Sequence, residues 1–99
     1  MTEPDPEPEP EPYELVLTPP AARAIRAGLP EAVAAAVIEF VTGALVENPR
    51  WVGKQLRGDL AGICSARRGT YRVLYRINDP RHEVVVLRIE HRSAAYRPR

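Results

Sequence analysis

The apolar residues of this chain recur with a period of two in its C-terminal half and with a spacing of three or four in its middle. Residues 70–78 carry an aromatic or β-branched side chain at every second position, which is typical of a half-buried strand. Turn residues separate this run from two more at about 62–67 and 83–90. We therefore expect three strands in an antiparallel meander.

The alternation also assigns faces, because successive side chains of a strand point to opposite sides of its sheet. One face of the central strand would carry Tyr71, Val73, Tyr75 and Ile77, and the other Arg72, Leu74 and Arg76. In the last strand the pattern predicts one face with Val85, Leu87 and Ile89 and another with Val84, Val86, Arg88 and Glu90. A strand with this much positive charge presents it to an anionic ligand or to acids of its own chain.

The N-terminal half predicts a short strand at 13–17 and then two helices. Thr18 is suited to cap the first helix, which tolerates two prolines in its first turn and ends at Gly28. The second helix opens at Pro30 and stops at Asn48-Pro49. Its apolar positions form one buried stripe of Val33, Val37, Phe40, Val41, Ala44 and Leu45.

The element order is thus β-α-α-β-β-β, which indicates an α+β domain. We expect a small, antiparallel-dominated sheet with a helical hairpin on one face. The other face would stay partly open to solvent or to a ligand. Residues 50–59, between the second helix and the meander, are expected to form a basic loop.

Residues 2–12 alternate acids with prolines, a pattern that excludes helix and sheet. We expect residues 1–12 to form a disordered acidic tail ahead of a single domain at 13–99. The tail either solubilises the chain or lies over its basic half as an internal phosphate mimic, and the sequence leaves both open.

The net charge of +1 conceals a strong asymmetry. Residues 50–99 carry twelve Lys and Arg against four acids, whereas residues 1–12 carry five acids and no base. Eleven of those twelve bases are arginines, whose planar guanidinium binds phosphate through paired hydrogen bonds. The C-terminal half therefore predicts a phosphate-bearing partner, with an acidic peptide as the alternative.

The cysteine count and the hydropathy argue against a disulfide-stabilised protein and against a membrane protein. Cys64 is the only cysteine, so no internal disulfide forms, and its alternation with Ala66 predicts a small buried residue. No apolar run approaches the roughly 20 residues that span a bilayer, and no signal peptide is visible. We expect a cytoplasmic protein without a membrane partner. The histidines and the cysteine lack ligand spacing, so we expect no metal and no cofactor.

Four short motifs, in order, resemble the RelE/ParE superfamily of bacterial toxin–antitoxin toxins over residues 13–97. They are Glu47-Asn48-Pro49-Arg50, Leu56-Arg57-Gly58, Arg67-x-x-x-Tyr71-Arg72-Val73-x-Tyr75 and His91-Arg92-x-x-x-Tyr96. The pattern is closer to the RelE branch than to ParE. The resemblance implies a fold similar to small microbial ribonucleases and an mRNA endoribonuclease that cuts in the ribosomal A site without a metal. In that reaction the ribose 2′-hydroxyl attacks the adjacent phosphate.

The resemblance also implies site residues. Arg67 matches the family arginine that would stabilise the phosphorane, and Tyr96 would stack on a base or transfer a proton. His91 suits general acid–base chemistry and Arg92 would bind phosphate. Four further cations are candidates for RNA and phosphate binding: Lys54, Arg57, Arg72 and Arg76.

The sequence leaves other roles open for three of these residues: Arg67 as a solvated arginine at a strand end, His91 as an ordinary hydrogen-bonding residue, and Tyr96 as a residue that folds the tail onto the sheet. The lysine and the strand arginines have alternatives too. The family lysine before the Leu-Arg-Gly motif is Gln55 here, and Lys54 is displaced by one residue, which on extended backbone reverses the side-chain direction. Arg72 or Arg76 would line the open face, or one of them would pair with Glu83 or Glu90 across the strands.

The predicted partners are mRNA, the ribosome and a cognate acidic antitoxin that forms a hetero-oligomer with the toxin and silences it. Two other functions compete with the ribonuclease. One is a ParE-like gyrase-inhibiting toxin without catalytic activity, and the other is a non-catalytic module that binds RNA or an acidic peptide.

Overall fold

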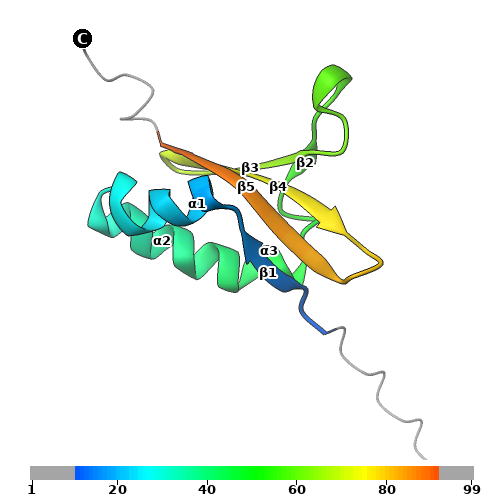
Figure 1. Cartoon of the computed structure of the whole chain (residues 1–99), viewed down its shortest axis with the longest axis horizontal. Helices are drawn as coiled ribbons and strands as arrows, with labels where there is room; N and C mark the ends of the chain where they lie inside the picture. The colour runs from blue at the N-terminus through cyan, green and yellow to red at the C-terminus, as the bar shows by residue number, and fades with distance from the viewer. Residues whose placement is uncertain (1–10, 92–99) are drawn as a thin grey trace, which may run out of the picture.

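The computed structural model describes residues 11–91 and shows a five-stranded sheet with its main helices on one side (Figure 1). The strands are β1 (Glu14–Leu17), β2 (Lys54–Gln55), β3 (Cys64–Arg68), β4 (Tyr71–Asn78) and β5 (Glu83–His91). Their order across the sheet is β1-β5-β4-β3-β2, in which β1 runs parallel to β5 and the other neighbours are antiparallel. The helical elements are α1 (Pro19–Arg23), η1 (Ala24–Gly28), α2 (Glu31–Thr42), α3 (Ala44–Glu47) and η2 (Gly58–Leu60). The predicted α+β order is confirmed.

Thr18 starts the helical layer as the sequence predicts. Its backbone is extended, and its hydroxyl oxygen accepts a hydrogen bond from the backbone N–H of Ala21 at 3.4 Å. The same hydroxyl donates to the carbonyl oxygen of Leu87 at 2.8 Å. The segment then continues through the π-helical turn η1, where the N–H of Leu29 donates to the carbonyl of Ala24 at 3.0 Å. The cap therefore also fixes α1 against β5.

The second predicted helix differs from the structure in one respect, because it is broken at Gly43. The backbone leaves the helical region there (φ −117°, ψ −98°), and a Cβ at this position would lie 3.0 Å from the carbonyl oxygen of Glu39. The hydroxyl of Thr42 donates to the carbonyl of Ile38 at 2.6 Å, a bond that competes with the helical ladder. The helix that the sequence extends to Asn48 is therefore two helices, α2 and α3.

The face assignment within the last strand was wrong beyond its midpoint. Tyr75 pairs with Val86 while Leu74 pairs with Arg88, so Leu87 is an extra residue without a partner on β4. Such a bulge changes the alternation. Val84, Val86 and Ile89 are all buried on the helix side, whereas Val85 and Leu87 are only partly buried.

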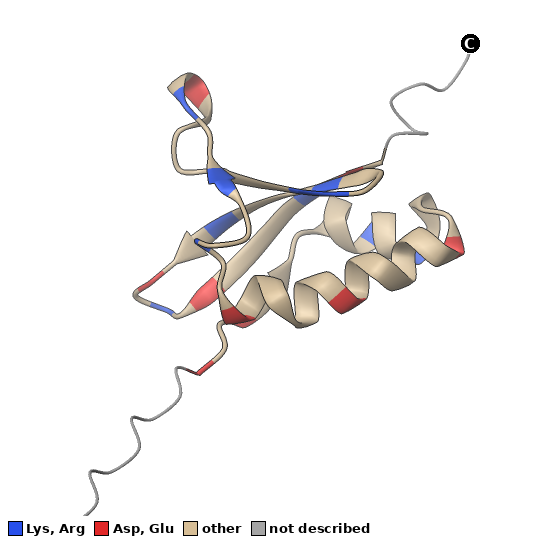
Figure 2. Cartoon of the chain, turned by 180° about the vertical axis from the view of Figure 1, so that it is seen from behind, with Lys and Arg blue, Asp and Glu red and all other residues tan. Residues whose placement is uncertain are grey.

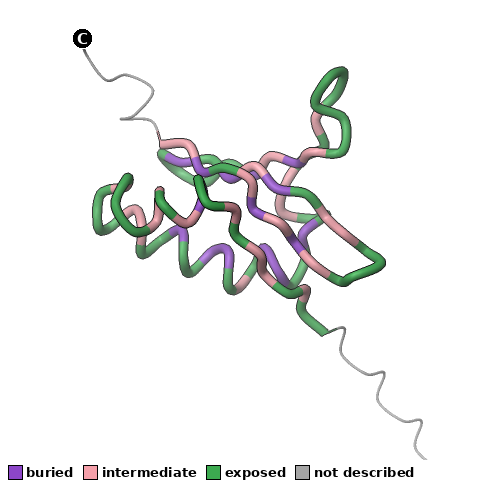
Figure 3. Tube along the Cα trace, viewed as in Figure 1, coloured by how far each residue is buried: buried purple, intermediate pink, exposed green. Residues whose placement is uncertain are grey.

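The core lies between the helices and this helix-side face (Figure 3). Tyr75 is fully buried, and its hydroxyl donates to the carbonyl oxygen of Pro49 at 2.5 Å. Burial raises the pKa of Tyr75 to about 12, so it stays protonated as this donor. The other buried apolar residues come from both layers and include Val37, Val41, Leu45, Val73, Val84 and Val86.

The basic loop contains a strand that the sequence pattern missed. Lys54 and Gln55 form β2 at the edge of the sheet, opposite Ser65 and Cys64 of β3. Two residues are too few to show an alternation, so only the pairing reveals this strand. The loop from 56 to 63, which contains η2, projects from the sheet on the side away from α2 (Figure 1).

Candidate functional site

The register of the sheet defines which side chains share its uncovered side. Residues that pair directly across neighbouring strands point to the same face. We call the side turned away from α1 and α2 the open face. Its four successive rows are Arg67, Arg72 and Glu90; Lys54, Ser65, Leu74 and Arg88; Arg76, Val85 and Val16; and Asn78, Glu83 and Glu14.

The open face is cationic over most of its length. Its first three rows contain five Lys or Arg side chains and one carboxylate, and all five cations are exposed, whereas the fourth row adds the carboxylates of Glu14 and Glu83. Figure 2 shows blue lysine and arginine segments along the strands, whereas α2 and α3 carry red acidic ones. Of the nine Lys and Arg residues between positions 50 and 91, five thus lie on the open face.

Arg67 and Arg72 lie directly opposite each other in the β3–β4 hairpin. Like charges at directly paired positions destabilise a sheet, and the Cβ atoms of such a pair are only about 5 Å apart. A bound anion removes this repulsion because both guanidinium groups can donate to it. The pair is therefore the part of the open face best suited to hold a phosphate.

Glu90 is the acid that adjoins this pair. Nε and Nη2 of Arg72 donate to one oxygen of Glu90, at 3.1 and 2.6 Å. This is the cross-strand pairing that the sequence offered as one alternative for Arg72. Both side chains are about half exposed, and such surface ion pairs contribute little stability. The ion pair with Glu90 orients the guanidinium of Arg72. A phosphate ligand can replace Glu90 as its partner.

The structure also determines which of two neighbouring residues in β2 faces the arginines. Lys54 pairs with Ser65 on the open face, whereas Gln55 pairs with Cys64 on the helix side. The displaced lysine thus shares the face of Arg67, Arg72 and Arg76. Arg57 is exposed in the projecting loop, whose base is closed by a 2.8 Å hydrogen bond from the N–H of Leu56 to the carbonyl of Ile63.

His91 lies on the other side of the sheet from Arg67. It pairs with Tyr71, which in turn pairs with Arg68, so these three share the helix-side face. The Nε2 atom of His91 is 3.1 Å from the hydroxyl oxygen of Thr70. Arg92 and Tyr96 lie outside the described residues, as do residues 1–10 of the predicted tail.

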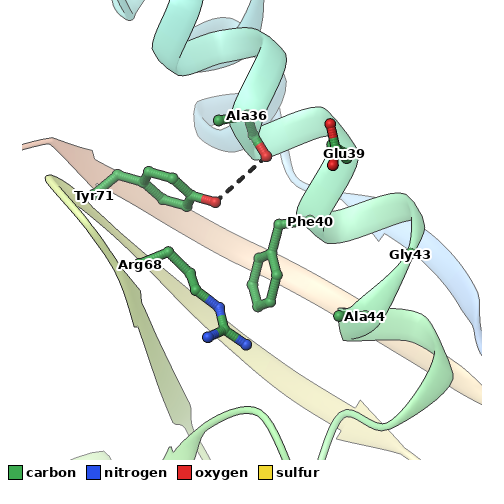
Figure 4. Close-up of a pocket in the computed structure, with 7 residues that line it drawn as sticks. All are labelled: Ala36, Glu39, Phe40, Gly43, Ala44, Arg68 and Tyr71. Carbon is green, nitrogen blue, oxygen red and sulfur yellow. Dashed lines mark hydrogen bonds between the residues drawn. The ribbon is translucent and has the colours of Figure 1, made fainter.

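A cavity of about 500 Å³ opens on the helix side, between α2 and the β3–β4 hairpin (Figure 4). The guanidinium of Arg68 stacks 4.8 Å from the centre of the Phe40 ring, and the hydroxyl of Tyr71 donates to the carbonyl of Ala36 at 3.4 Å. Glu39 and Arg68 are its charged lining residues. The cavity therefore lacks the excess of cations found on the open face.

The sequence pattern does not predict a polar cluster that lies where the β4–β5 turn meets the start of β1. Arg50 forms an ion pair with Asp79, and the Tyr13 hydroxyl donates to Asp79 at 3.0 Å. Hydrogen bonds from Arg50 and then Tyr13 lower the pKa of Asp79. The His82 ring stacks on Tyr13 at 3.9 Å, and its Nε2 atom is 2.8 Å from the carbonyl oxygen of Glu11. The cluster ties the β4–β5 turn to β1, so we assign it a structural role.

Residues 11–91 give little support for a metal site, a thiol nucleophile or a membrane-spanning helix. No group of three or more His, Cys, Asp or Glu side chains within that range could hold a metal ion. Burial raises the pKa of the Cys64 thiol, which disfavours the nucleophilic thiolate. No helix within the described range is long and apolar enough to cross a membrane.

Comparisons with known proteins agree with this architecture. The family model described as "ParE toxin of type II toxin-antitoxin system, parDE" matches residues 15–96. Toxin RelE of Mycobacterium tuberculosis is 52% identical over 85 residues, which cover 86% of this chain and 87% of that protein. Toxin RelG of the same organism is 56% identical over 69 residues, covering 70% of this chain and 79% of that protein.

Two solved structures extend the comparison to the fold. The RelBE2 toxin–antitoxin complex of M. tuberculosis contains a chain that matches with a TM-score of 0.79 and 51% identity, covering 83% of this chain and 100% of that one. The archaeal RelE–RelB complex of Pyrococcus horikoshii matches with a TM-score of 0.64 and 25% identity, covering 83% of this chain and 97% of its own.

Proposed function

Because this chain belongs to the ParE/RelE family of type II toxin–antitoxin toxins, we propose that it is an endoribonuclease toxin whose open face binds the RNA backbone. The observation that supports this most directly is the cross-strand pairing of Arg67 with Arg72. Two exposed guanidinium groups at directly paired positions of a hairpin can both donate to one phosphate group.

The proposed reaction needs no metal. The ribose 2′-hydroxyl attacks the adjacent phosphorus, the P–O5′ bond breaks, and the products are a 2′,3′-cyclic phosphate and a free 5′-hydroxyl. Negative charge accumulates on the phosphorane in the transition state, and preorganised donors stabilise it there. We assign this role to Arg67 and Arg72, with Lys54, Arg76 and Arg88 holding the flanking phosphates.

We do not assign proton transfer to His91, because this residue faces the helix side of the sheet. The proposed groups for this step are in the C-terminal segment, where Arg92 would bind phosphate and Tyr96 would transfer a proton or stack on a base. Both assignments come from the family motif at 91–96.

The proposed partners are mRNA on the ribosome and an acidic antitoxin. The matched M. tuberculosis and P. horikoshii structures are toxin–antitoxin complexes. We propose that the antitoxin of this chain places acidic side chains on the open face and so competes with RNA for the same cations. The cytoplasm, where mRNA is translated, is the proposed location.

The experiment incubates the purified chain with mRNA, with and without translating ribosomes, and maps the new RNA ends. We expect 2′,3′-cyclic phosphate ends, whose yield falls at least tenfold in Arg72→Gln, because each lost transition-state donor costs roughly 100-fold in rate. Arg26→Gln is the matched control, since Arg26 is an exposed arginine of η1. A toxic chain that leaves mRNA uncut in both conditions would contradict the proposal and favour the gyrase-inhibiting alternative.

A further inference from the structure

Trp51 is the most exposed large apolar residue that the structure describes. Its exposed fraction is 88%, against 50% for Leu60 and 45% for Ile38. Leaving an indole in water forgoes a large hydrophobic gain, and exposed aromatic residues are characteristic of interaction sites. Within residues 11–91 little covers the indole ring.

The backbone that carries Trp51 is firmly held. Its N–H donates to the carbonyl of Asn48 at 3.0 Å. Pro49, two residues before Trp51, is buried, and its carbonyl oxygen accepts a hydrogen bond from the Tyr75 hydroxyl. At Gly53 a Cβ would lie 2.3 Å from the Tyr75 hydroxyl oxygen and 2.9 Å from the Ser65 carbonyl, so only glycine allows this close approach. The turn is therefore pressed against β3 and β4. Binding a ligand at this position would therefore order the indole side chain but not its backbone.

The surroundings of Trp51 along the chain are cationic. Lys54 follows three residues later, at most about 11 Å away along extended backbone, and its side chain is on the open face. Arg57 is exposed in the projecting loop. An exposed aromatic ring beside backbone-binding cations is how proteins hold single-stranded nucleic acid, because every base has a face on which to stack.

A protein partner fits this position less well. A docked helix needs a groove with several apolar side chains, and the described cavity between α2 and the β3–β4 hairpin does not include Trp51. The residues that flank Trp51 are Arg50, already paired with Asp79, and the half-buried Val52. A single exposed ring next to cationic residues along the chain matches one base better than an apolar helix face.

We propose that Trp51 stacks on an unpaired base of the RNA whose phosphates lie on the open face. The inference rests on the proposed function, because the open-face cations supply the phosphate contacts that bring the base within reach. Trp51 is then a positioning residue: it sets which nucleotide lies over Arg67 and Arg72, and it takes no part in the chemistry.

The chain provides its own probe, because Trp51 is its only tryptophan. We would titrate the full chain with a single-stranded oligonucleotide that carries 2′-deoxyribose and so resists cleavage. Indole fluorescence would report stacking, and the anisotropy of a dye on the oligonucleotide would report binding. We expect quenching by this oligonucleotide and none by an abasic oligonucleotide of equal length, although both bind.

Substitution gives a second readout. We expect Trp51→Ala to weaken oligonucleotide binding by roughly 5- to 150-fold, and Trp51→Phe to retain most of the affinity, because base stacking on an aromatic ring contributes at about this level. Ile38→Ala, an exposed apolar residue of α2, is the matched control and should bind like the wild type.

The outcomes separate the two proposals. Binding by anisotropy without quenching, and with Trp51→Ala equal to the wild type, would overturn the stacking inference and leave the proposed function intact. Equal quenching by the abasic oligonucleotide would also overturn it. Absence of any binding in the wild type, at low salt, would instead contradict the open face as an RNA site. Quenching by an antitoxin alone would assign Trp51 to the protein interface.

Discussion

The two sides of the sheet differ more than any other two regions of this molecule. On the helix side the strands contribute Tyr75, Val73 and Val86, which are completely buried, and none of the buried residues in the range 11–91 is polar or charged. On the open face the same strands contribute Arg67, Arg72 and Arg76, all exposed. The helix side provides the buried contacts that stabilise the fold, and the open face provides exposed positive charge. Substitutions on the two sides should therefore have separable effects.

The largest effect on stability is expected at Tyr75. Tyr75→Ala empties a fully buried site and removes the donor to Pro49, so we expect a loss of about 3–5 kcal/mol in the free energy of unfolding. Tyr75→Phe keeps the ring and should cost only about 1–3 kcal/mol, since the Pro49 carbonyl loses its partner. Urea denaturation measures both.

The control for Tyr75 is its neighbour on the opposite face. Arg76→Ala should change the unfolding free energy by no more than about 0.5 kcal/mol, as is usual for an exposed position. Equal destabilisation by Tyr75→Ala and Arg76→Ala would break the separation of the two faces.

The next effect concerns RNA affinity. Arg72→Gln should weaken binding and reduce the slope of log K against log salt by about 0.7, the value for one phosphate contact on a single strand. Glu90→Gln should act in the opposite direction, because it releases Arg72 from its ion pair and removes the negative charge beside it. Equilibrium binding at several salt concentrations measures both. If Glu90→Gln weakens binding, Glu90 does not compete with the phosphate.

His91 tests whether a residue on the helix side of the sheet takes part in cleavage. His91→Gln should retain RNA cleavage, with a loss far below the roughly 100-fold that removal of a general acid or base causes. The test is the rate of mRNA cleavage by His91→Gln beside the wild type. A loss of about 100-fold would show that His91 reaches the substrate.

The smallest effect is expected in the polar cluster at the sheet end. The pKa of Asp79 is lowered in the folded state, from an ordinary value near 3.8, by hydrogen bonds from Arg50 and Tyr13. Its contribution to stability is therefore present above the unfolded pKa and is lost as the pH falls through the folded one. We expect Asp79→Asn to lower the melting temperature slightly at neutral pH. The difference from the wild type should vanish at strongly acidic pH, and a difference that persists there would show that the charge of Asp79 is irrelevant.

The sequence predicted the two faces of β4 correctly, because a strand with uninterrupted pairing obeys the period of two. It failed in β5, where the position of the bulge at Leu87 depends on how two strands pair and not on either sequence alone. The same limit applies to β2, which exists only through its pairing with β3. Arg50 and Asp79 are 29 residues apart, so no local pattern could reveal their contact.

For the site, the sequence supplied the residue types and the fold supplied the grouping. The sequence predicted that the arginines of β3 and β4 bind phosphate, and the turn between the strands brings Arg67 and Arg72 opposite each other. The sequence could not place His91 on the other face from Arg67, since that depends on the bulge earlier in β5. Trp51 was missed because exposure is a property of the folded chain.

Arg67 and Arg68 provide the most direct test of the claim that the open face is the RNA site. They are adjacent in β3, identical in type and both exposed, but Arg67 is on the open face while Arg68 stacks on Phe40 on the helix side. The measurement is the rate of mRNA cleavage by Arg67→Gln and by Arg68→Gln, on ribosomes and at equal protein concentration. We expect Arg67→Gln to lose at least tenfold and Arg68→Gln to cleave at nearly the wild-type rate. Equal losses, or a larger loss in Arg68→Gln, would contradict the assignment.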